Sequence, residues 1–467
     1  MELSGKPPQP PKLTLSTKLA YGAGDMGAGL TSNLLAFSFL IFLTNVAGLN
    51  PLAAGTVLLI GKVWDAVNDP IVGMLSDRTR TRWGRRYPWI VLTGVPFGVT
   101  FLLNWVVPGF GSQVALFWYY VVVSIVFQVF FTTTNLPYST LTAEMTEDYD
   151  ERTELTSFRL AFSLGGAVLI LALGLVVSQS IADPQRQYQV LGALGGGIAI
   201  ASLYWCVFGT FRHSQQQADY RGQRLHSGQT ANDASFLQQL KTVFSNRPFL
   251  FVVGIYLFSW LALQITATII PFYVTFWMGA DDYFLAALLV QGTAIIMMFV
   301  CNLLAKRIGK KGLYFLGTGI WILAQIALYT LQPGQLSAMY GLCVIVSFGV
   351  ATAYVVPWSI LPDVIELDEL KTGQRNEGAF YAFMTLLQKI GLALGIFLVS
   401  LALETSGFSA DAVTQPESAL LAIRFFIGPV PLVLLICGMV LAYFYPITKS
   451  AHAETLLRLA ERRQQAK

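Results

Sequence analysis

Two aspartates and an asparagine lie in the middle of a strongly apolar segment. The run LLIGKVWDAVNDPIVGML contains Asp65, Asn68 and Asp69, and Lys62 precedes Asp65 by about one helical turn. Residues three and four positions apart share one face of a helix, so both carboxylates and the amide are expected to point to one place. Hard cations prefer oxygen ligands, and the amide of Asn68 supplies one without adding charge.

The negative charges at Asp65 and Asp69 need a positive partner. An aspartate at the centre of a membrane span costs roughly 2.5 to 3.5 kcal/mol, and two cost more unless they are neutralised. Three partners are compatible with the sequence: Lys62 in a structural ion pair, a proton shared between adjacent carboxylates, or a bound monovalent metal ion. We expect the metal ion, held by Asp65 and Asp69.

A second deep charge is Lys389, about midway along the segment NEGAFYAFMTLLQKIGLALGIFLVS. A snorkelling side chain is one explanation, but the position is central for that role. We expect Lys389 to face a cavity and to interact with Asp65 and Asp69, with Thr385 one turn away in the same group. Cation binding would then change the electrostatics at Lys389, which is a route for coupling an ion to a solute.

The segment FFTTTNLPYSTLTAEM places Thr132, Thr133, Thr134 and Asn135 before Pro137. Proline frees a backbone carbonyl one turn earlier, and irregular backbone at membrane depth is tolerated where it lines a cavity. Threonines that hydrogen-bond to their own helix are the common alternative. Cavity lining and this structural role remain open for each residue.

Other apolar segments carry isolated polar or aromatic groups. Asp25 lies near the start of the first segment, where a packing or gating role is more usual than ligand binding. The aromatic residues Tyr354 and Trp358 could line a cavity, although core packing is more frequent. Small residues let helices approach closely, and such spacings surround Asp25. They are formed by Gly22, Gly24, Gly27 and Gly29.

Composition explains where these groups must lie. The 467 residues are 54% hydrophobic and only 12% charged, whereas a soluble domain carries about 25% charged residues. The apolar residues fall in blocks of membrane-spanning length, so we predict an all-α membrane protein with twelve transmembrane helices. The expected spans are 20–46, 52–76, 88–107, 114–140, 157–181, 189–211, 249–277, 283–305, 313–331, 336–361, 377–403 and 419–445.

Residue types also limit the chemistry. The four cysteines lie in apolar blocks at unrelated spacings, and the three histidines are expected in polar connecting segments. Neither a disulfide framework nor a histidine-based catalytic centre in the membrane is expected. The N-terminus lacks the features of a cleavable signal peptide, so the first span is expected to direct insertion.

The polar stretch 212–248 divides the spans six and six. We predict an N-terminal six-helix half over 1–211, a cytoplasmic linker over 212–248 with a short amphipathic helix, and a C-terminal six-helix half with a cytoplasmic tail over 249–467. Lysine and arginine concentrate in alternate connections. Positive residues are retained on the cytoplasmic side, so both termini are expected in the cytoplasm and the chain in the inner or plasma membrane.

The two halves share a pattern. GMLSDRTRTRWGRR follows the second span and NLLAKRIGKK follows the eighth, so a basic turn with glycine recurs six spans apart. Parallel six-span repeats around a central cavity are the build of major facilitator transporters. The first segment resembles that superfamily's signature loop, with Asp77 and Arg85 in its acidic and basic positions.

The chain resembles the glycoside-pentoside-hexuronide:cation symporter family, typified by the melibiose permease. The likeness covers nearly the whole chain and includes KLAYGAGDMG, VWDAVNDPIVG, TRWGRRYPWI, ERTELTSFR, PDVIELDEL and NEGAFYAFMTLLQK. The resemblance implies a major facilitator fold and places the family's cation site on Asp65, Asn68, Asp69 and Thr132. It also places the family's span-eleven lysine on Lys389, its span-five arginine on Arg159 and its span-ten cavity aromatic on Tyr354.

Two positions depart from the melibiose permease. The acidic residues that hold its galactoside in spans one and four are replaced by Gly29 and Asn135. Melibiose itself is therefore not the expected solute. The segments NLPYSTLT and VPWSILPDVI are also similar to the sodium-dependent lysophosphatidylcholine symporter branch of the family.

We predict symport of a small solute, coupled to Na⁺ or H⁺ and carried by alternating access. A glycoside is the first choice and a lysophospholipid the alternative. The expected partners are this solute and the bilayer, with no nucleic acid, no catalytic residues and a monomeric chain. An integral membrane lipid-modifying enzyme is the alternative of another class, but the sequence carries no visible nucleophile or base cluster for it.

Overall fold

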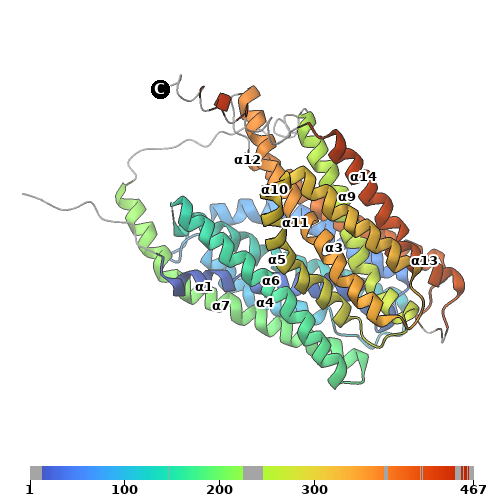
Figure 1. Ribbon diagram of the computed structural model, residues 1–467. Coiled ribbons are helices and arrows are strands. Elements are labelled where there is room, and N and C mark those ends of the chain that lie inside the picture. The colour runs from blue at the N-terminus through green and yellow to red at the C-terminus, as the bar shows by residue number, and fades with distance from the viewer. Residues whose placement is uncertain are drawn as a thin grey trace, which may run out of the picture. The chain divides into compact units, whose positions relative to one another are not determined.

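The computed structural model describes residues 13–146, 148–224, 246–372, 377–410, 412 and 414–446, together with 454–455, 457–459 and 461. The described chain is almost entirely helical (Figure 1). The helices are α1 Leu15–Ala23, α2 Met26–Asn45, α3 Pro51–Arg78, α4 Tyr87–Leu103, α5 Gln113–Met145, α6 Tyr149–Ser180, α7 Pro184–Arg224, α9 Arg247–Phe272, α10 Phe284–Thr330, α11 Leu336–Thr372, α12 Glu377–Thr405, α13 Glu417–Ile427 and α14 Pro429–Phe444, with a π-helical turn η1 over Tyr273–Trp277.

Nine helices of the described chain are long and apolar enough to cross a membrane. The twelve predicted spans are accounted for by three further observations. Helix α3 has sufficient length but carries three charges in its middle, and α4 is apolar but has only 17 residues. Helix α10 contains 47 residues, which would measure roughly 70 Å, about twice the thickness of a bilayer core.

A glycine divides α10 into two spans. Gly309 has φ 76° and ψ 166°, which is not helical and which residues with a Cβ rarely adopt. It lies in the predicted basic turn between the spans expected at 283–305 and 313–331. The chain therefore turns where the sequence predicted a loop. The helices before and after Gly309 reach this turn directly, with no extended loop between them.

Two other predicted spans are interrupted. The first consists of α1 and α2, which are separated at Gly24 and Asp25, and the last consists of α13 and α14, which are separated at Gly428. Internal prolines are retained in several helices, including Pro70 in α3 and Pro137 in α5. Neighbouring helices and polar side chains can satisfy the backbone groups that a proline frees.

The chain separates into two compact units by its internal contacts. The first consists of Met1–Leu35 and Ile60–Ala231, and the second of Ala36–Leu59 and Asn232–Lys467. The end of α2 and the start of α3 thus belong with the C-terminal helices. In this second unit the Tyr283 hydroxyl donates to Ser38 Oγ over 2.7 Å, and the Leu52 amide donates to Glu404 Oε2 over 3.3 Å.

The segment between the predicted halves is only partly described. Helix α7 continues beyond the expected span to Arg224, and residues 225–245, including the predicted amphipathic helix, lie outside the described residues. His213 is therefore helical rather than in a connecting loop. Its side chain is buried, and Nε2 lies 3.1 Å from the Met145 carbonyl oxygen.

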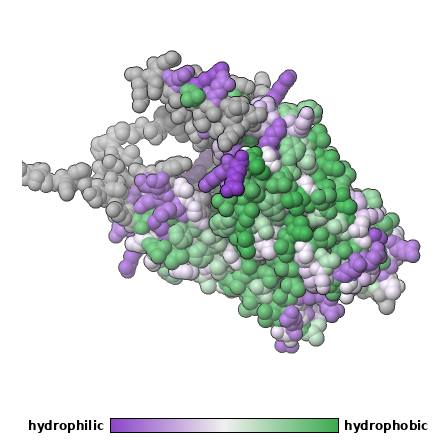
Figure 2. Space-filling view, in the orientation of Figure 1, coloured by the Kyte–Doolittle hydropathy of each residue, from purple (hydrophilic) through white to green (hydrophobic). Residues whose placement is uncertain are grey.

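Large apolar side chains cover the outside of the helices. Figure 2 shows a broad hydrophobic surface in the region where Figure 1 places α10 and α11. The exposed large apolar residues of α10 include Ile296, Phe299, Leu303 and Leu323. A soluble protein rarely exposes such a continuous apolar surface, whereas lipid tails solvate it.

Small residues set the closest helix contacts. A Cβ on Gly27 would lie 2.8 Å from the Ala199 Cβ, and a Cβ on Gly22 would lie 2.9 Å from the Phe158 carbonyl oxygen. The predicted close approach of helices around Asp25 is therefore confirmed. The tightest of these contacts, at Gly29, bears on the solute and is described below.

Candidate cation and solute sites

A threonine hydroxyl on α5 joins the two aspartates of α3. Thr132 Oγ1 lies 3.2 Å from Asp65 Oδ1 and 3.3 Å from Asp69 Oδ1. Thr132 and Asp65 are each 3% exposed. Two carboxylates on one helix face and a hydroxyl from the neighbouring helix thus form one oxygen cluster in the first unit, buried at Asp65 and Thr132 and half-buried at Asp69.

Asn68 lies beside this cluster. Its side chain is 5% exposed, and its Nδ2 donates to the Gln128 carbonyl oxygen over 3.4 Å. The amide nitrogen is therefore directed to the α5 backbone, and Oδ1 is the end of the amide that can act as a ligand. The structure brings together the four residues at which the sequence predicted a cation site.

The threonines after Thr132 have different partners. Thr133 donates to carbonyl oxygens of its own helix, at Val129 and Phe130, whereas Thr134 is hydrogen-bonded to Thr93 on α4. Asn135 is half-buried and uses its Nδ2 to donate to the Phe131 carbonyl oxygen over 3.0 Å. Only the first residue of the run reaches the aspartates in the described hydrogen bonds, and only a three-dimensional contact distinguishes it from the others.

The predicted lysines lie in different units. Lys62 is half-buried on α3, in the first unit, one turn before Asp65. Lys389 is half-buried on α12, in the second unit, and Thr385 is exposed and donates to the Tyr381 carbonyl oxygen over 3.0 Å. Lys62 thus remains an alternative partner for the aspartates, and the interaction of Lys389 with them remains a prediction.

Asp25 pairs with the arginine of the fifth predicted span. Arg159 Nε lies 3.3 Å from Asp25 Oδ2, and both side chains are half-buried in the first unit. The helix break at Gly24 and Asp25 brings the carboxylate to this position. The sequence favoured a packing or gating role for Asp25, and the family resemblance pointed to Arg159 separately; the structure shows the two as one ion pair.

Gly29 is a packing position rather than a site for a longer side chain. A Cβ at Gly29 would overlap with the backbone carbonyl oxygen of Ser163 on α6. Gly29 therefore marks a helix contact in this chain, at the position where the melibiose permease has an acidic residue. The close approach of α2 to α6 requires glycine and leaves no space for an acidic side chain.

In the signature loop, Asp77 pairs with Arg86, the residue that follows Arg85. Arg86 Nη2 lies 2.5 Å from Asp77 Oδ1, and its Nη1 donates to Ser76 Oγ over 2.7 Å. Arg85 is exposed and pairs with Glu144 on α5 at 3.0 Å, and Arg86 Nε lies 3.5 Å from the same carboxylate oxygen. The two adjacent arginines thus share Glu144, and only Arg86 also reaches Asp77, a difference that the sequence alone could not resolve.

The second unit repeats this arrangement. Lys310, in the turn of α10, donates to Asp363 Oδ1 and Oδ2 over 2.7 and 2.8 Å and to the Ser359 carbonyl oxygen over 2.7 Å. Each unit therefore fixes its basic turn to an acidic residue of another helix, Glu144 on α5 in the first unit and Asp363 on α11 in the second. The repeat predicted from the two basic turns is present in the contacts as well as in the sequence.

Aromatic side chains form a continuous chain in the second unit. Trp260 on α9 contacts Tyr354 on α11, with ring centroids 5.5 Å apart, and also Tyr256, at 5.7 Å. Trp358 contacts Tyr256 at 5.7 Å and stacks on Tyr381 of α12 at 6.0 Å. The sequence singled out Tyr354 and Trp358 but missed the α9 residues.

The missed residues had a detectable signal. Tyr256, Trp260, Gln264 and Thr268 recur every four positions, so they share one face of α9. All four are buried, and in the described part of the chain neither Trp260 Nε1 nor Thr268 Oγ1 has a hydrogen-bond partner. This polar and aromatic stripe makes one face of α9 a candidate part of a solute site.

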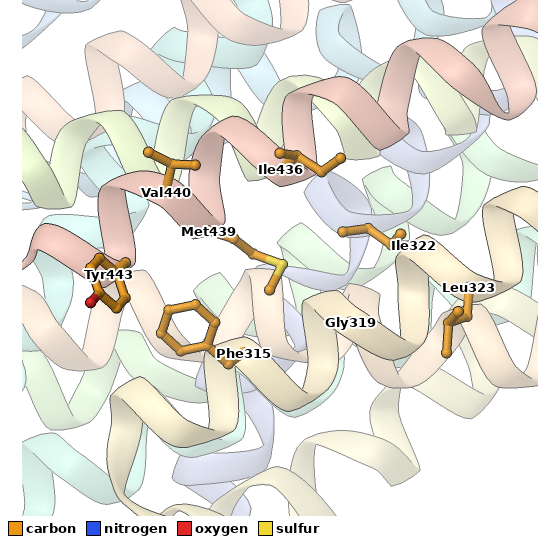
Figure 3. Close-up of a pocket in the computed structure, with 8 residues that line it drawn as sticks. All are labelled: Phe315, Gly319, Ile322, Leu323, Ile436, Met439, Val440 and Tyr443. Atoms are coloured by element: carbon orange, nitrogen blue, oxygen red, sulfur yellow. The ribbon is translucent and has the colours of Figure 1, made fainter.

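A separate groove of about 600 Å³ lies between α10 and α14. Figure 3 shows its lining, with Phe315, Ile322 and Leu323 on one side and Ile436, Met439 and Val440 on the other. All the lining side chains are apolar apart from the hydroxyl of Tyr443. Such a surface fits lipid tails and offers few groups that could orient a polar solute.

The fold and the buried charges define a class of protein. Two units of membrane-spanning helices, each with a fixed basic turn, are the build expected of a major facilitator transporter. The MFS/sugar transport protein family matches residues 20–449, which is nearly the whole chain. The chain belongs to this family, and it is a cation-coupled symporter rather than an enzyme.

Known relatives agree with this assignment. The chain is 42% identical to an uncharacterized symporter of Synechocystis, over 97% of this chain and 98% of the relative. It is 28% identical to sodium-dependent lysophosphatidylcholine symporter 1 of Xenopus tropicalis, over 94% of this chain and 88% of that protein.

Solved structures share the fold at low identity. The inward-open xylose transporter XylE from E. coli matches with a TM-score of 0.64 at 12% identity, over 95% of this chain and 99% of that structure. The nucleoside transporter NupG matches with a TM-score of 0.62 at 12% identity, over 92% of this chain and 97% of that structure. The predicted major facilitator fold is confirmed.

Proposed function

We propose that this chain couples the downhill movement of Na⁺ to the uptake of a small polar solute, with a glycoside as the first candidate. The observation that carries the cation assignment is the contact of one Thr132 hydroxyl with both Asp65 and Asp69. A hydroxyl from a second helix makes the pair of carboxylates into a multidentate oxygen site. A proton needs one carboxylate oxygen, whereas a metal ion needs several ligands, so this arrangement favours Na⁺ over H⁺.

The aromatic chain of the second unit supports a glycoside. Indole and phenol rings combine an apolar face with a polar edge, which suits a sugar ring that has apolar C–H groups and peripheral hydroxyls. The buried Trp260 Nε1 is a donor without a partner in the described chain, and a solute hydroxyl would accept its hydrogen bond.

A lysophospholipid is the second candidate. The sodium-dependent lysophosphatidylcholine symporters of Xenopus tropicalis and Mus musculus match 94% and 100% of this chain. Lys389 would offer a positive charge to a lipid phosphate, and Gly29 and Asn135 lack the carboxylates that would repel it. This candidate accounts for the absence of a carboxylate at Asn135, but it assigns no role to the Trp260 donor.

Coupling would follow from charge. Occupation of the site at Asp65 and Asp69 neutralises part of their negative charge, and Lys389 would respond if it faces the same cavity. Solute and cation would then be released together on the cytoplasmic side. This is the side on which the distribution of lysine and arginine predicts both termini. A single chain contains all the groups that this scheme uses.

The cation assignment is tested by Asp65→Asn and Asp69→Asn in proteoliposomes. Each variant should abolish Na⁺-driven uptake and retain normal membrane insertion. Full gradient-driven uptake by either variant would refute the site.

The solute is tested by a separate uptake screen of glycosides and lysophosphatidylcholine, with and without Na⁺. A glycoside substrate should lose affinity in Trp260→Phe, which keeps the ring and removes the donor. If Na⁺ stimulates the uptake of lysophosphatidylcholine and of no glycoside, the proposed substrate is the lipid and not a glycoside.

A further inference from the structure

Gln128 on α5 is buried next to the oxygen cluster and has an unused acceptor. Its side chain is 5% exposed, and Oε1 has no hydrogen-bond partner in the described part of the chain. Buried polar atoms are nearly always paired because desolvation without a hydrogen bond is costly. An orphaned amide oxygen in this position therefore suggests a ligand that occupies it during the transport cycle.

The packing of α3 on α5 determines which residue of α3 lies opposite Gln128. A Cβ on Gly61 would lie 3.5 Å from the Ser124 Cβ, and a Cβ on Gly73 would lie 3.7 Å from Leu136 Cδ2. The separation in sequence from Gly61 to Ser124 equals the separation from Gly73 to Leu136. The two helices therefore keep one register along this face.

The same register pairs Asp69 with Thr132, and it pairs Asp65 with Gln128. The first of these pairs is observed as a hydrogen bond of 3.3 Å. Gln128 precedes Thr132 by four residues, so the two side chains share one face of α5. Gln128 thus lies on the face that meets the aspartates, at the level of Asp65.

Asn68 provides an independent contact to the same residue. Its Nδ2 donates to the Gln128 carbonyl oxygen, which holds the α5 backbone at this point against α3. The contact therefore holds Gln128 itself, the residue whose Oε1 has no partner in the described chain. The backbone anchor and the helix register both place Gln128 at the edge of the cluster.

A neutral amide oxygen is chemically suited to complete this site. Asp65 and Asp69 provide two negative charges, Thr132 a hydroxyl oxygen and Asn68 an amide oxygen. A hard monovalent cation takes several oxygen ligands, and a further carboxylate would leave excess negative charge in the membrane. Glutamine adds a ligand without that charge.

We propose that Gln128 is a further ligand of the coupling cation and that its Oε1 binds the ion on the Asp65 side of the cluster. This inference rests on the proposed cation site. Binding of the ion supplies the missing partner of Oε1. Because a proton needs no such ligand, Gln128 increases the preference of the site for a metal ion over a proton.

The test uses Na⁺ alone as the probe. Purified full-length protein is titrated calorimetrically with NaCl at constant ionic strength, maintained with choline chloride. Gln128→Met keeps most of the side-chain volume and removes the oxygen, and it should raise the dissociation constant for Na⁺ at least about tenfold. The matched control is Ser124→Ala, one turn away on the same face, which should stay within about twofold of wild type.

A second variant covers the case in which Gln128→Met does not fold. Gln128→Asn keeps the amide but withdraws its oxygen by one methylene, so it should also weaken Na⁺ binding. Wild-type affinity in a folded Met or Asn variant, with Na⁺ binding lost in Asp65→Asn, would overturn the role of Gln128 and leave the cation site intact. Wild-type affinity in Asp65→Asn would refute the cation site itself.

Discussion

Removal of the Thr132 hydroxyl is the most direct perturbation of the proposed site. Thr132→Val replaces the hydroxyl by a methyl group of similar size, so the packing of α3 against α5 should change little. The variant loses the group that contacts both Asp65 Oδ1 and Asp69 Oδ1, at 3.2 and 3.3 Å. We expect weaker Na⁺ binding with normal expression and folding.

The magnitude follows from the geometry. One hydroxyl has one proton, so the two contacts count as a single hydrogen bond that alternates between the carboxylates. As a neutral oxygen ligand of the cation, the hydroxyl is expected to contribute about as much as a hydrogen bond to a charged group, 1.5–3 kcal/mol, and its long distances to the carboxylates, compared with the usual 2.7–2.8 Å for O–H···O, favour the lower value. Since 1.4 kcal/mol corresponds to a factor of ten, the Na⁺ concentration for half-maximal uptake should rise about tenfold.

The assay is solute uptake into proteoliposomes over a range of external Na⁺ concentrations, at a fixed membrane potential. Thr133→Val is the matched control, because the Thr133 hydroxyl donates only to carbonyl oxygens of its own helix in the described hydrogen bonds. Thr132→Ser retains the hydroxyl and should stay close to wild type. An unchanged Na⁺ dependence in Thr132→Val, or an equal shift in Thr133→Val, would refute the reasoning.

Three further predictions concern packing and the ends of the helices. Gly29→Asp should lower the melting temperature in detergent and should not create melibiose binding in calorimetry, because its Cβ overlaps with the α6 backbone; tight melibiose binding would contradict this. Arg86→Ala should lower the free energy of unfolding by about 1.5–3 kcal/mol, because Arg86 is the buried partner of charged and polar groups. Arg85→Ala should lower it less, and equal losses in the two variants would contradict this prediction. Gly55→Leu should abolish uptake because its side chain overlaps with α12 in the second unit, whereas Gly165→Leu enters open space and should transport normally; wild-type uptake by Gly55→Leu would show that this contact is dispensable.

The sequence determined the residues that needed explanation. Charges are so costly in a bilayer that Asp65, Asp69 and Lys389 stood out from composition and span length alone. Helical periodicity also placed the two carboxylates on one face, because that geometry is local to α3. The same local rules predicted the spans and the basic turn in which Gly309 reverses the chain.

The tertiary structure decided which of several equivalent residues makes each contact. Thr132 and Thr133 are adjacent in sequence and identical in chemistry, but the register of α3 on α5 directs only the first to the aspartates in the described hydrogen bonds. At the signature loop, Arg85 and Arg86 both reach Glu144, but only Arg86 also pairs with Asp77. These choices depend on the packing of helices distant in the chain, which hydrophobic patterns do not specify.

Space was the other quantity that the sequence could not give. Gly29 aligned with an acidic position of the melibiose permease, and only the approach of α6 showed that no side chain fits there. The sequence did not identify Gln128 as a ligand, because the amide of a glutamine in a membrane span can form hydrogen bonds with many different partners. Its burial without a partner for Oε1 is a property of the packed helices alone, and that property led to the additional cation ligand proposed here.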